Sequence, residues 1–334
     1  MMGLLGAGCA RTRPIASSGI WERLEFTRPQ MGVPFRMVVY ATNEALAQRA
    51  VEQAFARIVD LNRIFSDYDP ESEVSRLCHE TPVGAEALVS GEMALVIDRS
   101  QLLAKASDGA FDITVGPLVN LWRRARRHKE LPPPHLLSEA RARVGWHHLR
   151  VDRRRSMVTF GVADMRLDFG GIAKGYAADE ALRVLREHGF PKALVAAAGD
   201  VAVGDAPPGQ PGWRIDVGGG GAAGSPPPRT ALLVNAAIGT SGDAFQFLDI
   251  DGVRYSHILD PRNGLGVTNR CQVTVIAKDG LTSDSLGTAV SVLGPAAGLR
   301  LIERTRGAAG LIIEARDAGV SELRSRRLKQ WLVE

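Results

Sequence analysis

Two oxygen-bearing side chains near the carboxyl end of the sequence could hold a metal ion. Asp284 and Thr288 stand four residues apart in a stretch, about 283–293, that is predicted to be helical. Residues four apart lie on one face of a helix, so the carboxylate and the hydroxyl would point the same way. Such hard oxygen ligands suit Mg²⁺, which usually keeps water and ligand phosphates in its shell. With Ser283 as helix cap, Asp284 would fall in the first turn and could instead serve only the helix dipole.

A glycine-rich segment, residues 167–179, could bind phosphate. It runs from a predicted strand through Gly170 and Gly171 into a predicted helix that carries Lys174. Glycines let the backbone approach a ligand, and a helix amino terminus with a lysine favours phosphate oxygens. The segment matches neither GxxxxGK[ST] nor GxGxxG, so no standard nucleotide fingerprint applies. A purely structural strand-to-helix turn would give the same pattern.

Two further segments offer an aromatic ring, a carboxylate and an imidazole. In residues 108–117 an Asp-Gly turn precedes Phe111, which could stack on a flat ring, and Asp112, which could accept hydrogen bonds. In residues 255–264, His257 lies in a strand-like run before a turn. Histidine titrates near neutral pH and suits a general base. Alternatively, Phe111 could be a buried core residue, and His257 could be a structural residue whose hydrogen bonds are satisfied within the protein.

The periodicity of apolar residues predicts the elements that would position these groups. Residues 20–42 alternate as strands around Gly32 and Pro34, and Asn43 is suited to cap a long helix that ends near Phe65. A second helix is predicted over 90–107, with its inward face formed by Ala94, Ile97, Leu102 and Ala104.

The remaining elements follow from the same patterns. Helices are predicted from Ser138 and over about 171–188, 283–293 and 296–305. Strands are predicted over about 147–151, 157–161, 165–168, 193–197, 201–204, 213–217, 231–234, 273–276 and 309–314. Helices and strands do not alternate regularly, which favours an α+β fold with mixed, largely antiparallel sheets and packed helices over a doubly wound sheet. A helix followed by several strands occurs twice, as a duplicated motif would give. We expect an N-terminal segment, 1–19, and a single domain, 20–334.

Composition and charge narrow the classes of function. The chain has 334 residues, of which 45% are hydrophobic, so it can bury a full core. The net charge is only +4, and much of the excess lies in the basic run 123–129. Because this run leads into prolines 132–134, we expect a solvated loop over 123–135. No aromatic residues interleave with the basic ones, as nucleic-acid stacking would require. Three cysteines without CxxC spacing indicate neither a zinc site nor a disulfide framework.

The amino terminus resembles the end of a bacterial lipoprotein signal. Residues 4–8 are apolar or small and precede Cys9, although a basic region is missing and the apolar stretch is short. A start upstream of the given sequence would explain both. We therefore expect an exported protein with a lipid anchor at Cys9, on the periplasmic face of the bacterial inner membrane. The alternative is a disordered cytoplasmic tail.

Together the chemical segments resemble one known family. Residues 31–32, 65–68 and 70–75 precede the four segments above, and their order along 30–315 is similar to that of the FAD:protein FMN transferase, or ApbE, family. Several ordered segments coincide by chance far less often than one. The resemblance implies an α+β fold that holds FAD in a cleft with Mg²⁺ on its pyrophosphate. The enzyme would join FMN through a phosphoester bond to a threonine of an acceptor protein, releasing AMP.

The resemblance also assigns roles residue by residue. Asp284, Thr288 and the backbone carbonyl of Gly171 would hold the metal, and His257 would activate the threonine. Val33 and Pro34 depart from the residues usual after the opening Met-Gly, which bears on the local flavin contact. The residues that would contact FAD are Met31, Tyr68, Ala110, Phe111, Asp112, Asp168, Lys174 and Leu259.

The acceptor should be a separate flavin-carrying redox protein or domain, because the sequence has no Asp-x-[Ala/Ser]-Thr segment of the family's target type. Two other functions use the same residues. A FAD pyrophosphatase would replace threonine by water, and a non-catalytic FAD-binding protein would leave His257 and the Asp284–Thr288 pair without a role.

Overall fold

The computed structural model describes residues 20–219, 227–242, 247–316 and 319–333. Its centre is an eight-stranded sheet in the order β1-β2-β6-β7-β10-β13-β14-β15, in which all neighbours are antiparallel. The expected α+β fold with largely antiparallel sheets is confirmed. The strands are β1 (Glu22–Gln30), β2 (Val33–Ala41), β6 (Ala193–Ala197), β7 (Asp200–Val203), β10 (Ala236–Gly242), β13 (Cys271–Ala277), β14 (Ala309–Arg316) and β15 (Gly319–Arg324).

The first hairpin ends in a tight turn. β1 and β2 pair over their whole length, and Met31 and Gly32 connect them with φ angles of 48° and 76°. Two successive positive φ angles are typical of the hairpin turns that fit the twist of a sheet. The turn holds Met31 at one end of the sheet, where the cavity described below opens.

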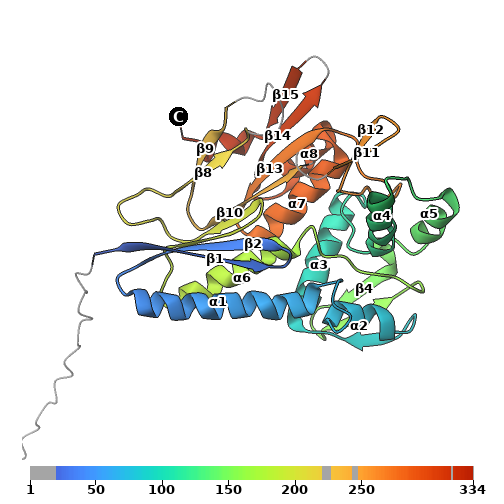
Figure 1. Cartoon of the computed structure of the whole chain (residues 1–334), viewed down its shortest axis with the longest axis horizontal. Coiled ribbons are helices and arrows are strands. Elements are labelled where there is room, and N and C mark those ends of the chain that lie inside the picture. Colours follow the sequence, from blue (N-terminus) through green and yellow to red (C-terminus); the bar gives the residue numbers. More distant parts are fainter. Residues whose placement is uncertain (1–19, 220–226, 243–246, 317–318, 334) are drawn as a thin grey trace, which may run out of the picture.

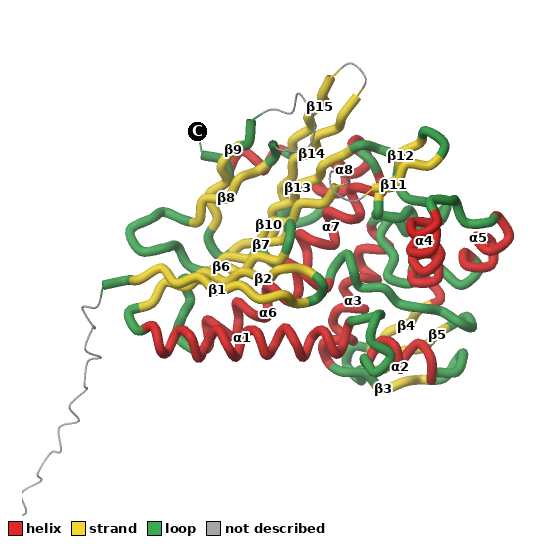
Figure 2. Tube along the Cα trace, viewed as in Figure 1, coloured by secondary structure: helices red, strands yellow, loops and turns green. Residues whose placement is uncertain are grey.

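Helices cover one face of the sheet (Figures 1 and 2). They are α1 (Glu44–Phe65), α6 (Ala173–Glu187), α7 (Gly280–Leu293) and α8 (Pro295–Arg304), while α3 (Gly91–Ala106) packs against α1 and α7. The predicted cap of α1 is confirmed, because the Asn43 side chain accepts a hydrogen bond from the Leu46 N–H. In α3 the expected inward position of Leu102 is wrong, since this side chain is 61% exposed.

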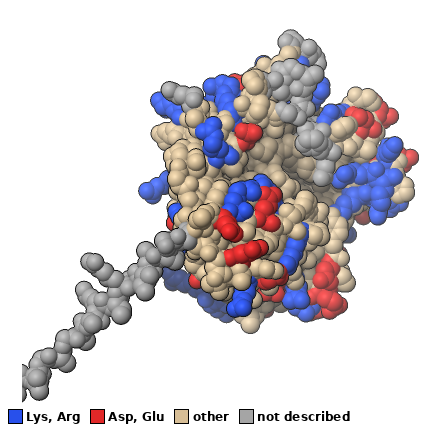
Figure 3. Space-filling model, turned by 60° about the vertical axis from the view of Figure 1, so that its left-hand side comes forward, with Lys and Arg blue, Asp and Glu red and all other residues tan. Residues whose placement is uncertain are grey.

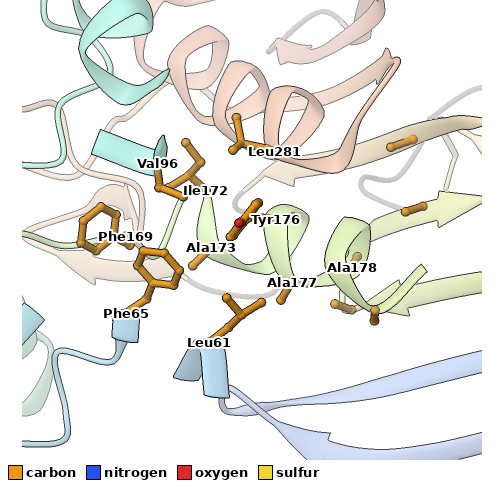
Figure 4. Packing of buried hydrophobic residues seen from close by; sticks show 14 of the residues in the cluster. Leu61, Phe65, Val96, Phe169, Ile172, Ala173, Tyr176, Ala177, Ala178 and Leu281 are labelled. Atoms are coloured by element: carbon orange, nitrogen blue, oxygen red, sulfur yellow. The ribbon is translucent and has the colours of Figure 1, made fainter. Parts of the chain in front are cut away.

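Helices α1, α6 and α7 form the main core. Figure 4 shows Leu61 and Phe65 of α1 pointing toward α6. The Phe65 ring meets Phe169 edge-on at 5.1 Å between centroids and Tyr176 at 6.0 Å. Such aromatic pairs stabilise a core by about 0.5–1.5 kcal/mol beyond area burial. They anchor the segment that leads into α6 against the end of α1.

Helices α6 and α7 approach each other closely where Gly175 faces Gly280. A Cβ atom on Gly175 would lie 2.1 Å from the Gly280 carbonyl oxygen, so only glycine fits. The carboxylate of Asp179 on α6 accepts hydrogen bonds from the N–H groups of Gly280 and Leu281, at 2.7 and 2.9 Å. These contacts fix the start of α7 relative to α6.

The other face of the sheet has a second core, formed with the hairpin β8 (Trp213–Val217) and β9 (Arg229–Leu233) and the short helix η2 (Arg326–Gln330). The remaining elements flank the cavity side of the molecule. They are α2 (Glu73–Glu80), α4 (Gly116–His128), α5 (Pro134–Arg141), η1 (Trp146–His148), the small sheet of β3 (Glu86–Leu88), β5 (Met157–Phe160) and β4 (Leu149–Asp152), and the hairpin of β11 (Phe247–Ile250) and β12 (Val253–Ser256).

Two predicted elements and one predicted helix cap are wrong. The basic run 123–129 belongs mostly to helix α4, because Leu118, Trp122 and Ala125 form a buried stripe at helical spacing. Residues 165–168 make only an isolated bridge, between Arg166 and Val115, instead of a strand. Helix α7 begins at Gly280 and its cap is Asp279, whose side chain accepts from Thr282, so Ser283 is not the cap. Asp284 and Thr288 both lie within α7, so their four-residue spacing still places them on one face of the helix. Within the described ranges, no helix combines the length and apolar character needed to cross a bilayer.

Candidate functional site

One large cavity gathers the predicted residues. Its volume is about 1190 Å³, above the range of about 300–1,000 Å³ common for sites that bind small ligands. The turns after β1 and β6, the end of α1, the start of α6 and one side of α7 all border it. All twelve residues predicted for the site line it: Met31, Tyr68, Ala110, Phe111, Asp112, Asp168, Gly171, Lys174, His257, Leu259, Asp284 and Thr288.

The glycine-rich segment forms a compact turn at the cavity wall. The Asp168 carboxylate accepts a hydrogen bond from the Gly170 N–H at 2.8 Å, and α6 then begins at Ala173. The Lys174 Nζ donates to the Gly170 carbonyl at 2.8 Å. Burial raises the pKa of Asp168, the neighbouring Asp67 adds to this effect, and the hydrogen bond from Gly170 opposes it. The segment thus presents a helix start and an ammonium group to the cavity.

The three predicted metal donors converge from two segments. A Cβ atom on Gly171 would lie 2.9 Å from the Thr288 Oγ1, so the Gly171 backbone runs directly beside this hydroxyl. Asp284 is buried one turn earlier on α7, and its Oδ2 accepts a hydrogen bond from the Gly175 N–H at 3.0 Å. Its other carboxylate oxygen accepts no hydrogen bond from the described part of the chain. A carboxylate, a hydroxyl and a neighbouring carbonyl therefore border one small region.

Asp200 is a charged group of the site that the sequence did not predict. It begins β7 after a tight turn in which Ala198 has a φ of 53°, and only 5% of the residue is exposed. The Lys174 Nζ lies 3.9 Å from the Asp200 Oδ2 and 3.7 Å from the Asp284 Oδ2. A Cβ atom on Gly239 would lie 2.8 Å from the Asp200 Oδ1 and 3.1 Å from the Ser283 backbone, so a larger residue there would crowd this carboxylate. Lys174 thus lies between two buried carboxylates.

The charges of this cluster influence one another. Burial and the nearby Asp284 raise the pKa of Asp200 well above its usual value, and Lys174 counteracts only part of this. Burial alone would lower the pKa of Lys174, but Asp284 and Asp200 outweigh it, so its pKa is raised. The lysine therefore stays charged, while two carboxylates compete for it. A bound cation would relieve the excess of negative charge.

The segment around Phe111 is a structural part of the wall. Phe111 is only 4% exposed and belongs to the main core. The Asp112 Oδ1 accepts from the Thr114 N–H and hydroxyl at 2.8 and 2.7 Å, and its Oδ2 accepts from the Trp146 N–H at 2.7 Å. Burial raises the pKa of Asp112, and these hydrogen bonds oppose the shift. Both carboxylate oxygens already have protein partners, so Asp112 also holds the loop in place.

Arg123 is a second residue that the sequence analysis did not assign to the site. Its guanidinium lies 4.1 Å from the centre of the Tyr68 ring and donates to the Asp67 carboxylate at 2.6 Å. It also reaches Asp168 at 3.4 Å. The Tyr68 residue is 76% exposed. Arg123 thus connects the rim of the cavity to the glycine-rich segment. The sequence did not indicate this role, because Arg123 is one of several cations in a basic run.

The segment that carries His257 borders the cavity immediately after β12. His257 is half-buried, and Leu259 two residues later is buried and forms a bridge with Gly266. The Asp260 side chain accepts from the Arg262 N–H at 2.9 Å and closes the following turn. The imidazole therefore stands on a short, internally bonded loop that faces the same cavity as Asp284 and Thr288.

Comparisons with known proteins agree on one family. The ApbE family model matches residues 31–312. The FAD:protein FMN transferase of Haemophilus influenzae is 30% identical over 285 residues, which cover 83% of this chain and 82% of the relative. That of Vibrio cholerae is 30% identical over 335 residues, covering 98% and 96%.

Solved structures give the same result. The flavin transferase ApbE from Vibrio cholerae superposes with a TM-score of 0.83 at 28% identity, covering 94% of this chain and 100% of that one. The apo form of the flavinyl transferase ApbE from Pseudomonas stutzeri gives a TM-score of 0.82 at 30% identity, with 93% and 97% covered.

Proposed function

The chain belongs to the ApbE family and is a flavin transferase, and we propose that it moves FMN from FAD to a threonine of an acceptor protein in trans. The threonine Oγ would attack the phosphorus of the FMN half. The anhydride bond to the AMP half would break, AMP would leave with the bridging oxygen, and the acceptor would carry FMN as a phosphoester. The observation that carries the proposal is the gathering of all twelve predicted residues around one cavity.

The residues present fit a magnesium ion. No group of three or more His, Cys, Asp or Glu side chains in the described ranges is placed to hold a metal, so a transition-metal site is not favoured there. Asp284, Thr288 and the Gly171 carbonyl supply hard oxygen atoms instead, which Mg²⁺ accepts together with water and phosphate oxygens. These three residues would hold the ion. When bound, it would act as a Lewis acid that offsets charge on the pyrophosphate.

Lys174 and the start of α6 would bind the phosphate groups of FAD. The lysine ammonium stays charged between Asp200 and Asp284. The N–H groups of Ala173 and Gly175 already donate to the Phe169 carbonyl and to Asp284. The charge of Lys174 and the positive end of the α6 dipole favour an anionic ligand at this wall. Phosphoryl transfer depends mainly on orientation and on charge stabilisation, so these groups would supply much of the catalysis.

His257 would remove the proton of the threonine hydroxyl as its oxygen attacks, and would then release that proton to solvent. This role needs a histidine that faces the cavity from a segment other than the phosphate-binding wall, so that the acceptor can enter between them. The loop after β12 meets this need. General-base catalysis of this kind typically contributes about 10²–10⁴-fold to the rate.

Co-expression with a candidate acceptor domain tests the proposal. A mass increase equal to FMN on a threonine supports transfer, and an unmodified acceptor contradicts it. Incubation with FAD and Mg²⁺ without an acceptor separates transfer from hydrolysis, because rapid AMP release would identify a FAD pyrophosphatase. Tight FAD binding that ignores Mg²⁺, with no turnover, would identify a carrier.

We also propose that the protein acts at the periplasmic face of the bacterial inner membrane through a lipid at Cys9. Cys9 lies outside the described residues, so this proposal rests on the sequence pattern of residues 4–9 alone. Metabolic labelling of cells with a tagged fatty acid tests it. Label on the wild-type chain and none on Cys9→Ser is the expected result, and label on neither would refute it.

A further inference from the structure

The exposed side of α4 carries a group of cations without anionic partners. Arg124, Arg126, Arg127 and Lys129 are all exposed, and within the described part of the chain none of them lies within 4.0 Å of a carboxylate. Elsewhere on the surface, Arg28, Arg155 and Arg183 pair with glutamates, whereas Arg49, Arg214 and Arg300 have no carboxylate within 4.0 Å in the described ranges. The α4 group differs because four such cations lie within six residues, 124–129. Figure 3 shows a dense gathering of Lys and Arg at its right-hand edge, the side on which α4 lies.

This group, hereafter the α4 basic face, adjoins the cavity. Val119 and Arg123 on the same helix, and Val115 just before it, line the cavity, whereas the four cations are exposed to solvent. Arg123 also stacks on Tyr68, whose ring is exposed at the rim. A molecule that lies on the α4 basic face therefore borders the entrance to the site.

Local stability does not account for the whole group. Cations in the last turn of a helix interact favourably with its dipole, which favours Arg126 and Arg127. Arg124 lies earlier, and like charges three or four residues apart, as in Arg123–Arg127 and Arg124–Arg127, oppose helix formation. Unpaired cations beside an active site are better explained by a partner that supplies the negative charge.

We propose that the α4 basic face binds an acidic surface of the acceptor protein next to the threonine that receives FMN. This inference rests on the proposed function, which requires a protein to reach the cavity entrance. An anionic membrane on the same face would instead cover the entrance that the acceptor must reach. Complementary charge around an entrance increases the rate of encounter and fixes the orientation of the partner.

Two labelled peptides test the proposal. Both carry a central Asp-Gly-Ala-Thr segment, flanked in one by glutamates and in the other by serines. Fluorescence anisotropy measures their binding to the whole protein with FAD and Mg²⁺, at low and at high salt. The variant R124E/R127E removes the α4 charges, and R304E/R306E makes the same change of charge at exposed arginines that do not line the cavity.

We expect the wild type and R304E/R306E to bind the glutamate-flanked peptide about tenfold more tightly than the serine-flanked one at low salt, with the preference reduced by salt. R124E/R127E should lose the preference and keep its affinity for FAD. An equal preference in all three proteins, or none in the wild type, overturns the proposal. So does sedimentation with phosphatidylglycerol vesicles that requires Arg124 and Arg127 while peptide binding does not, since the face would then bind lipid.

The same samples separate this inference from the proposed function. Mass measurement of the peptides reports FMN addition independently of affinity. Charge-dependent binding without any FMN addition or AMP release contradicts the proposed function and leaves the binding face supported. FMN addition that is equal for both peptides, and unchanged in R124E/R127E, supports the function and refutes the binding face.

Discussion

The two walls of the cavity are built in different ways. The wall of α6 and α7 is buried, and its spacing is fixed by the Gly175–Gly280 approach and by the Asp179 carboxylate, which accepts from the first N–H groups of α7. The wall of α4 and the loop after β12 ends in exposed groups such as Tyr68 and the α4 cations. The first wall can position oxygen atoms rigidly around a pyrophosphate. The second ends in exposed groups, so we propose that the phosphate chemistry takes place at the first wall and that the acceptor approaches along the second.

The largest effect should follow from removing the carboxylate of the buried wall. Asp284→Ala takes away the only charged donor of the proposed metal site and leaves Lys174 paired with Asp200 alone. We expect FMN transfer to fall at least about 100-fold, together with a loss of Mn²⁺ binding measured by electron paramagnetic resonance. Asp216→Ala, at an exposed position in β8, is the control. Normal Mn²⁺ affinity in Asp284→Ala would show that the metal lies elsewhere.

A smaller but still large effect is expected at the wall of α4 and the loop after β12. His257→Ala should slow single-turnover transfer by about 10²–10⁴-fold while FAD affinity, followed by flavin fluorescence, stays unchanged. His79→Ala changes an exposed histidine of α2 outside the cavity and should behave as the wild type. If His257→Ala instead weakens FAD binding and keeps the rate, His257 binds FAD and does not act as the base.

The capping of α7 gives a prediction about pH. Burial raises the pKa of Asp179 to about 7, and its hydrogen bonds from Gly280 and Leu281 oppose the shift only in part. A carboxyl group with a raised pKa binds more protons in the folded than in the unfolded state, so its contribution to stability decreases as pH rises from about 4 to about 7. The slope is at most ~1.4 kcal/mol per pH unit.

Urea unfolding of the wild type and Asp179→Asn at several pH values measures this contribution. The asparagine keeps a hydrogen-bond acceptor for the α7 cap but has no proton to lose. We expect the unfolding free energy of the wild type to fall more steeply than that of the variant over this range. If the unfolding free energies of the two proteins change in parallel with pH, the pKa of Asp179 is not raised by folding.

The smallest effect is expected at Gly171. Alanine there would place its Cβ atom 2.9 Å from the Thr288 Oγ1, and the threonine can move slightly to accommodate it while the Gly171 carbonyl remains. Gly171→Ala should weaken Mn²⁺ binding only a few-fold. Gly175→Ala should have a larger effect. Its Cβ atom would lie 2.1 Å from the Gly280 carbonyl oxygen, which belongs to the backbone, so the substitution should destabilise the fold by several kcal/mol. If both substitutions lower the free energy of unfolding equally, the distinction between Gly171, which faces a side chain, and Gly175, which faces backbone, is wrong.

The sequence predicted best what local interactions decide. The cap at Asn43 and the apolar spacing of α1 placed this helix correctly, since both signals lie within the helix itself. Helix α4 was missed because its arginines concealed the buried stripe of Leu118, Trp122 and Ala125. The sequence favours Ser283 as the cap of α7, although Asp279, four residues earlier, has the geometry for it.

The candidate site was predicted as a set of residues but not as a network. Family resemblance supplied twelve positions, and the fold brings all of them to one cavity. Asp200 and Arg123 were not predicted, because their contacts with Lys174, Asp67 and Asp168 join segments far apart in the sequence. A glycine followed by aspartate after a strand, as in 199–200, was the available signal, and it also fits an ordinary turn.

The proposed metal site is tested by the position of a divalent cation when FAD is bound. Crystals grown with FAD and Mn²⁺ locate the ion by its anomalous scattering. We predict one peak within bonding distance of an Asp284 carboxylate oxygen, the Thr288 hydroxyl and a pyrophosphate oxygen, at the wall of α6 and α7. A flavin dinucleotide in the cavity whose pyrophosphate lies away from these residues, with Mn²⁺ elsewhere or absent, would contradict the account.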